Sequence, residues 1–361
     1  MPVTARFHPL AIQEIRPETP EAVSLAFAVP EDLREAYRFT PGQYLTLKTE
    51  HEGEEIRRSY SICSGLDDGE LRVAVKRIPG GRFSGLLGEA IRPGHVLDVM
   101  TPMGRFGVEP DPAAARAYVG LACGSGITPI LSILKSTLKR EPRSRFFLFY
   151  GNRTTGSIIF REALEDLKDR FVERLSVFHV LSREAQDVPI LNGRLDGEKI
   201  SLLLRTVVPA SSVDHVFVCG PGTMLDDAEA ALKALGVPDE RMHFERFTPA
   251  EGGAGRPVPR PPVAPDAAPK ATAEIILDGV RHAFPVAEGE AIVDAALRAG
   301  LDLPYSCKGG MCCTCRAKVV EGEVEMIQNY SLEPWEIAAG YALTCQSLPK
   351  TPRVVVDYDH F

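Results

Sequence analysis

Nine residues near the carboxyl end of the chain, Cys307-Lys-Gly-Gly-Met-Cys-Cys-Thr-Cys315, decide how the whole sequence is interpreted. A further cysteine, Cys345, follows after 29 residues, so four thiols fit the spacing C-x4-C-x2-C…C. Glycine allows a loop to curl closely around a bound group, because a Cβ at Gly309 or Gly310 would obstruct the approach. The segment therefore predicts a metal cluster that is held by thiolates.

The spacing is typical of a plant-type [2Fe-2S] cluster. Zinc sites usually combine two short Cys-x2-Cys pairs, whereas here one cysteine stands alone. Cys313 does not fit as a ligand, since it would leave gaps of five residues and one, and we expect it to be a small neighbour of the cluster. Buried thiols without a metal are the remaining alternative. The predicted iron ligands are Cys307, Cys312, Cys315 and Cys345.

Residues 272–361, which carry this motif, resemble plant-type ferredoxins. The resemblance implies a β-grasp-like α+β domain with an opening hairpin at 273–277 and 281–285 and a helix at 291–299. The segment holds 13 acidic and 7 basic residues, and a bound cluster would add further negative charge. We therefore expect its electron-transfer partner to present a basic docking surface.

The composition is that of an ordinary globular enzyme, with 44% hydrophobic and 25% charged residues. A net charge of −8 disfavours binding to nucleic acid. The longest apolar runs are too short to span a membrane, and the first residues lack the apolar core of a signal peptide. We expect a cytoplasmic protein that binds neither nucleic acid nor membrane.

A length of 361 residues predicts two or three domains. Residues 249–271 contain seven prolines and three glycines, which is typical of an extended tether, although an ordered surface loop is an alternative. Residues 1–112 show short β-type runs between turns and predict an antiparallel β-barrel. Residues 113–248 alternate strand and helix patterns and predict a doubly wound α/β domain, whose ligands bind at the carboxyl ends of the strands.

The first candidate cofactor motif is Arg58-Ser-Tyr60-Ser61, which continues to Ser64 and resembles the ferredoxin-reductase family. The resemblance implies that Arg58 pairs with a flavin phosphate, that Tyr60 packs on the isoalloxazine, and that Ser61 lies near flavin N5. A planar guanidinium and an aromatic face suit these roles. A half-buried strand without a ligand would show the same alternation.

Gly80-Gly81-Arg-Phe-Ser84 precedes an expected helix at 85–90. Backbone amides at a helix start, with Gly81 and Ser84, suit a pyrophosphate and favour FAD over FMN. The alternative is a glycine turn with Ser84 as the helix N-cap.

Gly124-Ser-Gly126-Ile-Thr128-Pro129 follows an expected strand and precedes a helix. A proline replaces the last glycine of the ordinary dinucleotide fingerprint, so that motif is not met. Proline in the first turn of a helix is compatible with an open N-terminus, and the ferredoxin-reductase family carries G-x-G-x-x-P. A plain turn between strand and helix is the alternative.

A second glycine turn, Cys219-Gly220-Pro-Gly222, ends another expected strand. The family resemblance implies that Cys219 lies near nicotinamide C4, and that Glu245 and Phe247 lie beside the flavin. A small buried cysteine and two ordinary strand residues are the alternatives. The catalytic candidates are Ser61, Cys219 and Glu245.

Ser182 and Arg183 follow the third expected strand of the α/β domain. An acidic side chain there would bind the ribose 2′-hydroxyl, whereas a hydroxyl and a guanidinium suit a 2′-phosphate. NADPH is therefore favoured over NADH, although Glu184 weakens the argument and Arg183 fits an ordinary surface residue too.

Flavin, nicotinamide and [2Fe-2S] sites together predict electron transfer, because a flavin accepts a hydride and delivers single electrons. Over its whole length the chain resembles reductase components of multicomponent oxygenases, through 57–64, 80–84, 150–153 and 307–315. The resemblance implies the di-iron phenylacetyl-CoA epoxidase as acceptor, with Rieske ring-hydroxylating and ketosteroid oxygenases as alternatives. A free-flavin reductase and a non-enzymatic iron–sulfur redox sensor are the other rivals.

Overall fold

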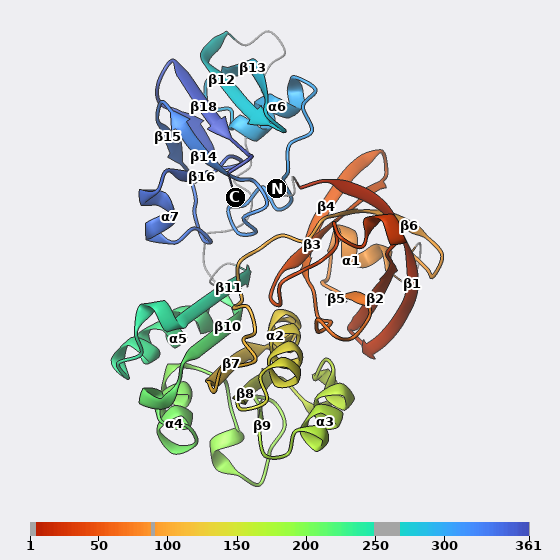
Figure 1. The fold of residues 1–361 in the computed structure, drawn as a ribbon, viewed down its shortest axis with the longest axis vertical. Coiled ribbons are helices and arrows are strands. Elements are labelled where there is room, and N and C mark those ends of the chain that lie inside the picture. Colours follow the sequence, from red (N-terminus) through yellow and green to blue (C-terminus); the bar gives the residue numbers. More distant parts are fainter. Residues whose placement is uncertain (1–4, 88–90, 249–267, 361) are drawn as a thin grey trace. The chain divides into compact units, whose positions relative to one another are not determined.

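The computed structural model describes residues 5–87, 91–248 and 268–360 (Figure 1). Contacts divide the chain into two compact units. One unit comprises residues 8–56 and 60–248, and the other contains the carboxyl-terminal residues.

The amino-terminal part of the larger unit is an antiparallel β-barrel of six strands in the order β4-β3-β6-β1-β2-β5. Alternate residues of the strands point inward, and the buried side chains include Leu25, Leu45 and Leu47. The expected barrel is confirmed. Its strands are β1 (Phe7–Thr19), β2 (Ala22–Ala28), β3 (Tyr44–His51), β4 (Glu54–Ser61), β5 (Leu71–Lys76) and β6 (Val96–Met100).

Helix α1 (Arg82–Leu86) of the barrel domain differs from the helix expected at 85–90. It begins three residues earlier and ends at Leu86, while 88–90 lie outside the described residues. Gly80 has φ +71°, a backbone conformation that residues with a side chain rarely adopt. The Ser84 Oγ accepts a hydrogen bond from the Ile78 N–H at 3.2 Å. This turn starts the helix early and places Ser84 inside it.

The rest of the larger unit is a parallel five-stranded sheet in the order β11-β10-β7-β8-β9. Its strands and helices alternate along the chain, as the sequence predicts. Strands are β7 (Ala117–Cys123), β8 (Arg145–Asn152), β9 (Leu175–Leu181), β10 (His215–Pro221) and β11 (Met242–Thr248), and helices are α2 (Ile127–Arg140), α3 (Arg161–Arg170), α4 (Gly197–Thr206) and α5 (Gly222–Ala234).

Both faces of this sheet are covered. One apolar core includes Ile130 of α2 and Leu164 of α3, and the other includes Leu203 of α4 and Leu225 of α5. The strand order reverses beside β7, where β8 lies on one side and β10 on the other. In doubly wound sheets, ligands bind at the carboxyl ends of the strands at such a reversal.

Helix α2 also contacts the barrel. The Ser132 Oγ donates to the Ser64 carbonyl at 2.7 Å, and Lys135 Nζ lies 2.8 Å from an Asp68 carboxylate oxygen. Arg140 pairs with Asp67 at 3.0 Å. These contacts join the barrel and the α/β domain within one unit.

The smaller unit has a five-stranded mixed sheet in the order β13-β12-β18-β14-β16, with β12 and β18 parallel. A small hairpin, β15–β17, completes it. The predicted α+β class is confirmed. The elements are β12 (Pro269–Leu277), β13 (Val280–Ala287), α6 (Ile292–Arg298), β14 (Arg316–Glu321), β15 (Val324–Met326), α7 (Pro334–Ala338), β16 (Tyr341–Leu343), β17 (Ser347–Pro349) and β18 (Arg353–Asp357).

The tether was expected to extend to residue 271, but β12 already begins at Pro269 and pairs with β13. Residues 249–267 lie outside the described residues. No helix in the described part of the chain is long and apolar enough to cross a membrane.

Candidate functional site

The four predicted iron ligands come together in the smaller unit as two pairs of thiols. Cys307 contacts Cys312 through its side chain, and Cys315 contacts Cys345 in the same way. The first three lie on the loop between α6 and β14, and Cys345 follows β16. Strand pairing of β14 with β16 brings the distant fourth thiol to the loop.

Within each pair of thiols, the contact between the two side chains favours the thiolate form of Cys307 or Cys345 and raises the pKa of its partner, Cys312 or Cys315. Cys312 and the backbone amides of Gly309 and Met311 lower the pKa of Cys307 to about 6, and the amide nitrogens lie 3.3 and 3.5 Å from its sulfur. Cys315 likewise lowers the pKa of Cys345. Thiolates are the form that binds metal, so the local hydrogen bonding suits a metal site.

The geometry fits a two-iron cluster, which takes two thiolates on each iron. Within residues 5–87, 91–248 and 268–360, no three His, Cys, Asp or Glu side chains converge so as to hold a single ion. The Ser306 hydroxyl, beside Cys307, is buried and has no hydrogen-bond partner among the described residues, which leaves a donor for a cluster sulfur. The Cys313 side chain instead contacts Ser331.

A glycine is required in the loop. Gly310 has φ +75, and a Cβ there would lie 2.9 Å from the Gln328 carbonyl oxygen. Any other residue would strain the backbone that places Cys307 and Cys312.

The candidate flavin residues lie on β4 and at α1. The exposed Arg58 guanidinium donates to the Arg57 carbonyl at 2.7 Å. The Tyr60 ring centroid lies 5.4 Å from that of Phe83, so β4 and the turn at 80–84 are neighbours. A Cβ on Gly81 would come within 2.9 Å of the Ile78 carbonyl oxygen, a backbone atom, so the turn needs glycine.

Ser64 is placed differently from the expectation of a flavin contact. It has 0% exposure, its hydroxyl accepts from the Arg72 N–H at 3.1 Å, and its carbonyl accepts from Ser132. These contacts leave Ser64 no surface for a cofactor, and we assign it a structural role at the joint between the barrel and α2.

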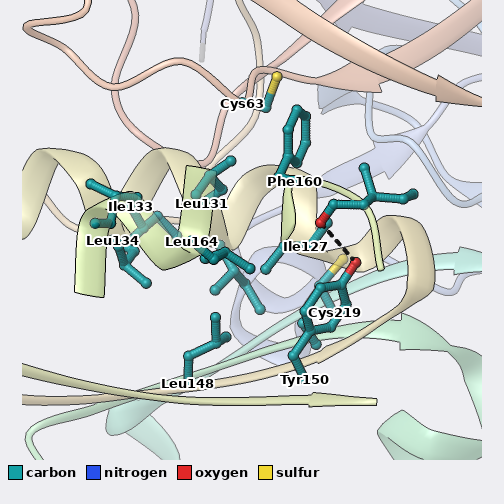
Figure 2. Close-up of a cluster of buried hydrophobic side chains, with 14 of the residues drawn as sticks. Cys63, Ile127, Leu131, Ile133, Leu134, Leu148, Tyr150, Phe160, Leu164 and Cys219 are labelled. Carbon is teal, nitrogen blue, oxygen red and sulfur yellow. Dashed lines mark hydrogen bonds between the residues drawn. The ribbon is translucent and has the colours of Figure 1, made fainter. Parts of the chain in front are cut away.

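The three catalytic candidates converge although they come from distant parts of the chain. The Ser61 Oγ of β4 donates to Glu245 Oε2 of β11 at 3.1 Å, across 184 residues of sequence. The Cys219 Sγ at the end of β10 lies 4.0 Å from the same oxygen. Figure 2 shows Cys219 in the buried cluster that also holds Tyr150 and Ile127.

Burial controls the charge of these groups. The Glu245 residue keeps some exposure, but protein surrounds its carboxyl group, and burial raises its pKa to about 8 while the Ser61 hydrogen bond opposes the shift. Burial also raises the pKa of Cys219 well above its usual value. At neutral pH both groups therefore hold a proton.

The two glycine turns of the α/β domain contact each other. A Cβ on Gly126 would lie 2.1 Å from the Cys219 carbonyl oxygen, and one on Gly220 would lie 2.9 Å from Met224 Sδ. Gly124 has φ +54, and Gly222 begins α5. This close approach brings together the carboxyl ends of β7 and β10, where the sequence predicts the nucleotide site.

Three further predicted cofactor-binding residues, Thr128, Pro129 and Phe247, make contacts within the protein. The Thr128 hydroxyl donates to the Ser125 carbonyl at 3.0 Å, and Pro129 is buried in the first turn of α2. Phe247 packs at the edge of the apolar core that includes Cys219. Thr128 therefore stabilises the turn through its side chain.

Ser182 and Arg183 lie exposed after β9. Glu184 is turned to Thr155, whose N–H and hydroxyl donate to its carboxylate at 2.8 and 2.6 Å. These hydrogen bonds lower the pKa of Glu184, so its carboxylate stays charged and is held toward Thr155.

Two cations at this edge were missed by sequence reasoning. The Arg153 carbonyl accepts from the Arg183 N–H at 2.8 Å, and the Arg153 guanidinium lies 3.3 Å from Glu21. Lys76 Nζ lies 3.6 Å from the same carboxylate and 4.0 Å from the place of a Cβ on Gly124. Arg153 directly follows the carboxyl end of β8, and that position in the sequence could have identified it as a candidate ligand-binding residue.

Three segments of the chain match known family models. Residues 10–107 match the oxidoreductase FAD-binding domain, residues 121–230 the oxidoreductase NAD-binding domain, and residues 275–350 the 2Fe-2S iron-sulfur cluster binding domain.

Among characterised proteins, the chain is 50% identical to one of the subunits of the 1,2-phenylacetyl-CoA epoxidase of Escherichia coli (strain K12), over 98% of both chains. It is 35% identical to the ferredoxin reductase component of the 3-ketosteroid-9-alpha-monooxygenase of Rhodococcus rhodochrous, over 97% of this chain and 96% of that one.

Among solved structures, phthalate dioxygenase reductase aligns with a TM-score of 0.58 and 22% identity, over 97% of this chain and 98% of its own. That likeness concerns the fold. The domain matches and the two relatives show that the chain belongs to the family of oxygenase reductase components with FAD-, NAD- and 2Fe-2S-binding domains, which are NAD(P)H-dependent flavin and iron–sulfur oxidoreductases.

Proposed function

We propose that this chain passes electrons from NADPH through FAD and a [2Fe-2S] cluster to the di-iron oxygenase component of a phenylacetyl-CoA epoxidase. The acceptor is inferred from the 50% identity to one of the subunits of such an epoxidase over almost the whole of both chains. The observation that carries the chemistry is the meeting of Ser61, Cys219 and Glu245, because it joins the barrel to the predicted nucleotide site.

A bound flavin supplies the change from a two-electron hydride to single electrons. In this proposal Arg58 binds a flavin phosphate, Gly81 lets the backbone approach the pyrophosphate, and Tyr60 offers its ring face. The Ser61 hydroxyl orients the reacting edge. Glu245 stays protonated at neutral pH because its pKa is raised, so its carboxyl group can supply a proton at this edge while Oε2 accepts the hydrogen bond from Ser61.

The nicotinamide coenzyme occupies the predicted nucleotide site at Gly124, Gly126, Gly220 and Gly222. The uncharged Cys219 thiol packs beneath the reacting end without adding a charge there, and Phe247 borders it. Ser182, Arg183 and Arg153 bind the 2′-phosphate, which gives the preference for NADPH. A guanidinium group suits a phosphate because it can donate two parallel hydrogen bonds, and the backbone bond from the Arg183 N–H to the Arg153 carbonyl keeps the two residues close.

Cys307, Cys312, Cys315 and Cys345 would hold the cluster. The domains are assigned to 1–112, 113–248 and 272–361, and the tether after residue 248 ends before Pro269. The activity is assigned to the cytoplasm, where reducing conditions keep thiols such as Cys219 reduced.

Reconstitution tests the acceptor. The holoenzyme is mixed with NADPH and, in separate reactions, with the oxygenase components of a phenylacetyl-CoA epoxidase, a 3-ketosteroid monooxygenase and a Rieske dioxygenase. We expect oxygenated product with the epoxidase at a kcat/KM at least about tenfold above the other two, a difference of about 1.4 kcal/mol. Equal or greater coupling to either alternative would overturn the assignment.

A further inference from the structure

The short helix α7 (Pro334–Ala338) of the smaller unit exposes apolar side chains and buries a charged one, the reverse of an ordinary surface helix. It exposes Trp335 by 59% and Ile337 by 45%, while its one buried residue is the charged Glu336, at 5%. Surface helices normally bury their apolar side chains and expose their charges. Trp335 is also the only tryptophan among 361 residues.

Ion pairing holds the helix in this orientation. Glu336 Oε1 lies 2.8 Å from the buried Arg316 Nε, and the Arg316 guanidinium lies 3.5 Å from the centroid of the Tyr341 ring. The Glu336 carboxylate also accepts from the Glu333 N–H at 3.1 Å. A buried charge needs such partners, so the contacts to Glu336 fix α7 with Trp335 directed outward.

The same contacts tie α7 to the loop of the candidate cluster. Arg316 directly follows Cys315, and the Gly310 carbonyl accepts from the Tyr330 N–H at 3.0 Å and from the Ser331 hydroxyl at 3.2 Å. The segment is therefore anchored to the cysteine loop both before and within the helix. An acceptor that docks on Trp335 would be held beside this loop.

We propose that Trp335 and Ile337 form the apolar centre of the surface on which the oxygenase component docks, and that this partner presents an apolar recess edged with Lys and Arg. The proposal rests on the proposed function. Tryptophan is one of the residue types enriched among the few that dominate the binding energy of protein interfaces.

The net negative charge of this chain favours a different protein, rather than a second copy of the chain, as the partner. Residues 272–361 hold 13 acidic and 7 basic side chains, and residues 1–248 hold 34 acidic and 31 basic, so both parts of this chain are net negative. A complementary basic rim is therefore expected from a different protein. Six of the seven basic side chains already pair with acids of the same unit: Arg281, Arg298, Lys308, Arg316, Lys350 and Arg353.

The test uses the holoenzyme with Trp335→Ala, Trp335→Phe and, as a matched control, Val280→Ala. Val280 is 52% exposed on β13 of the same unit. Flavin content, ferricyanide reduction and the NADPH-reduced EPR signal of the cluster establish that each variant is intact. We expect Trp335→Ala to raise the KM for the oxygenase component about 10- to 30-fold, Trp335→Phe to raise it less, and Val280→Ala to leave it unchanged.

A single fluorotryptophan gives a direct readout of docking. Because Trp335 is unique, chain labelled with 5-fluorotryptophan gives one ¹⁹F resonance, and we expect it to shift or broaden when unlabelled oxygenase component is added. An unchanged resonance at oxygenase concentrations that saturate turnover, or a Trp335→Ala KM within twofold of the parent, would overturn the docking surface.

The two proposals fail in different ways. If the parent couples to another oxygenase but not to the epoxidase, the proposed acceptor is wrong, and the variants are then measured with the oxygenase that couples. If the parent couples to the epoxidase and Trp335→Ala couples equally well, only the docking surface is wrong. If the parent couples to no oxygenase, both are overturned.

Discussion

Replacing Gly126 by alanine tests whether the contact between the two glycine turns sets the geometry for hydride transfer. The added Cβ would lie 2.1 Å from the Cys219 carbonyl oxygen and 2.5 Å from its carbon, both backbone atoms that no rotamer change can move. An ordinary contact needs about 3.4 Å, so the start of α2 and the end of β10 must separate by about 1.3 Å. A misplacement of about 1 Å costs on the order of 10²-fold in rate.

The assay is anaerobic stopped-flow reduction of the flavin by NADPH, followed by loss of flavin absorbance. We expect Gly126→Ala to slow this step about 100-fold while direct reduction of the cluster by dithionite is unchanged. Gly156→Ala is the matched control, because a Cβ at Gly156, in the same domain, would meet nothing within 4 Å. A parent-like rate in Gly126→Ala, or an equal loss in Gly156→Ala, would refute the reasoning.

Three further variants test the other sites. Arg183→Ala should raise the KM for NADPH about tenfold without changing that for NADH, because only NADPH carries the 2′-phosphate, and equal KM values for both coenzymes in the parent would contradict the assignment. Cys345→Ser should abolish cytochrome c reduction but leave NADPH-dependent ferricyanide reduction within twofold, and parallel loss of both would count against separate sites. Burial raises the pKa of Glu245 to about 8, so a step that needs its proton should slow as the pH rises through about 8. Glu245→Gln should lower the rate about 10²-fold and remove that pH dependence. A transition near pH 8 that persists in Glu245→Gln would refute the role.

The sequence predicted best what depends on local pattern. Short β-type runs at 23–29, 43–47 and 71–75 correspond to β2, β3 and β5, and helical patterns at 129–139 and 161–170 correspond to α2 and α3. The spacing of the thiols predicted which four cysteines gather, because three lie on one short loop. Strand β1 (Phe7–Thr19) was missed, since its polar and proline residues obscure the alternation.

Other features depend on contacts between distant segments. Helix α2 buries Ser64, and the Ser132 hydroxyl of that helix donates to the Ser64 carbonyl. No local sequence pattern indicates this burial. Arg153 and Lys76 meet only through Glu21. The exposure of Trp335 depends on the ion pair between Arg316 and Glu336, which are 20 residues apart in the sequence.

The meeting of Ser61 with Glu245 across 184 residues was expected only through the family resemblance. Spacing alone cannot place two single residues together, because the fold between them determines whether they meet. The structure supplies that link, since β4 and β11 bring the two side chains to 3.1 Å.

Anaerobic titration of the cofactor-replete protein with NADPH, followed by absorbance and EPR, tests the central claim most directly. The proposed path predicts that flavin absorbance falls and that a one-electron-reduced [2Fe-2S] signal then appears, and that Cys345→Ser keeps the first change and loses the second. Protein that contains both cofactors but shows no flavin reduction, or shows flavin reduction with no cluster signal, would contradict it.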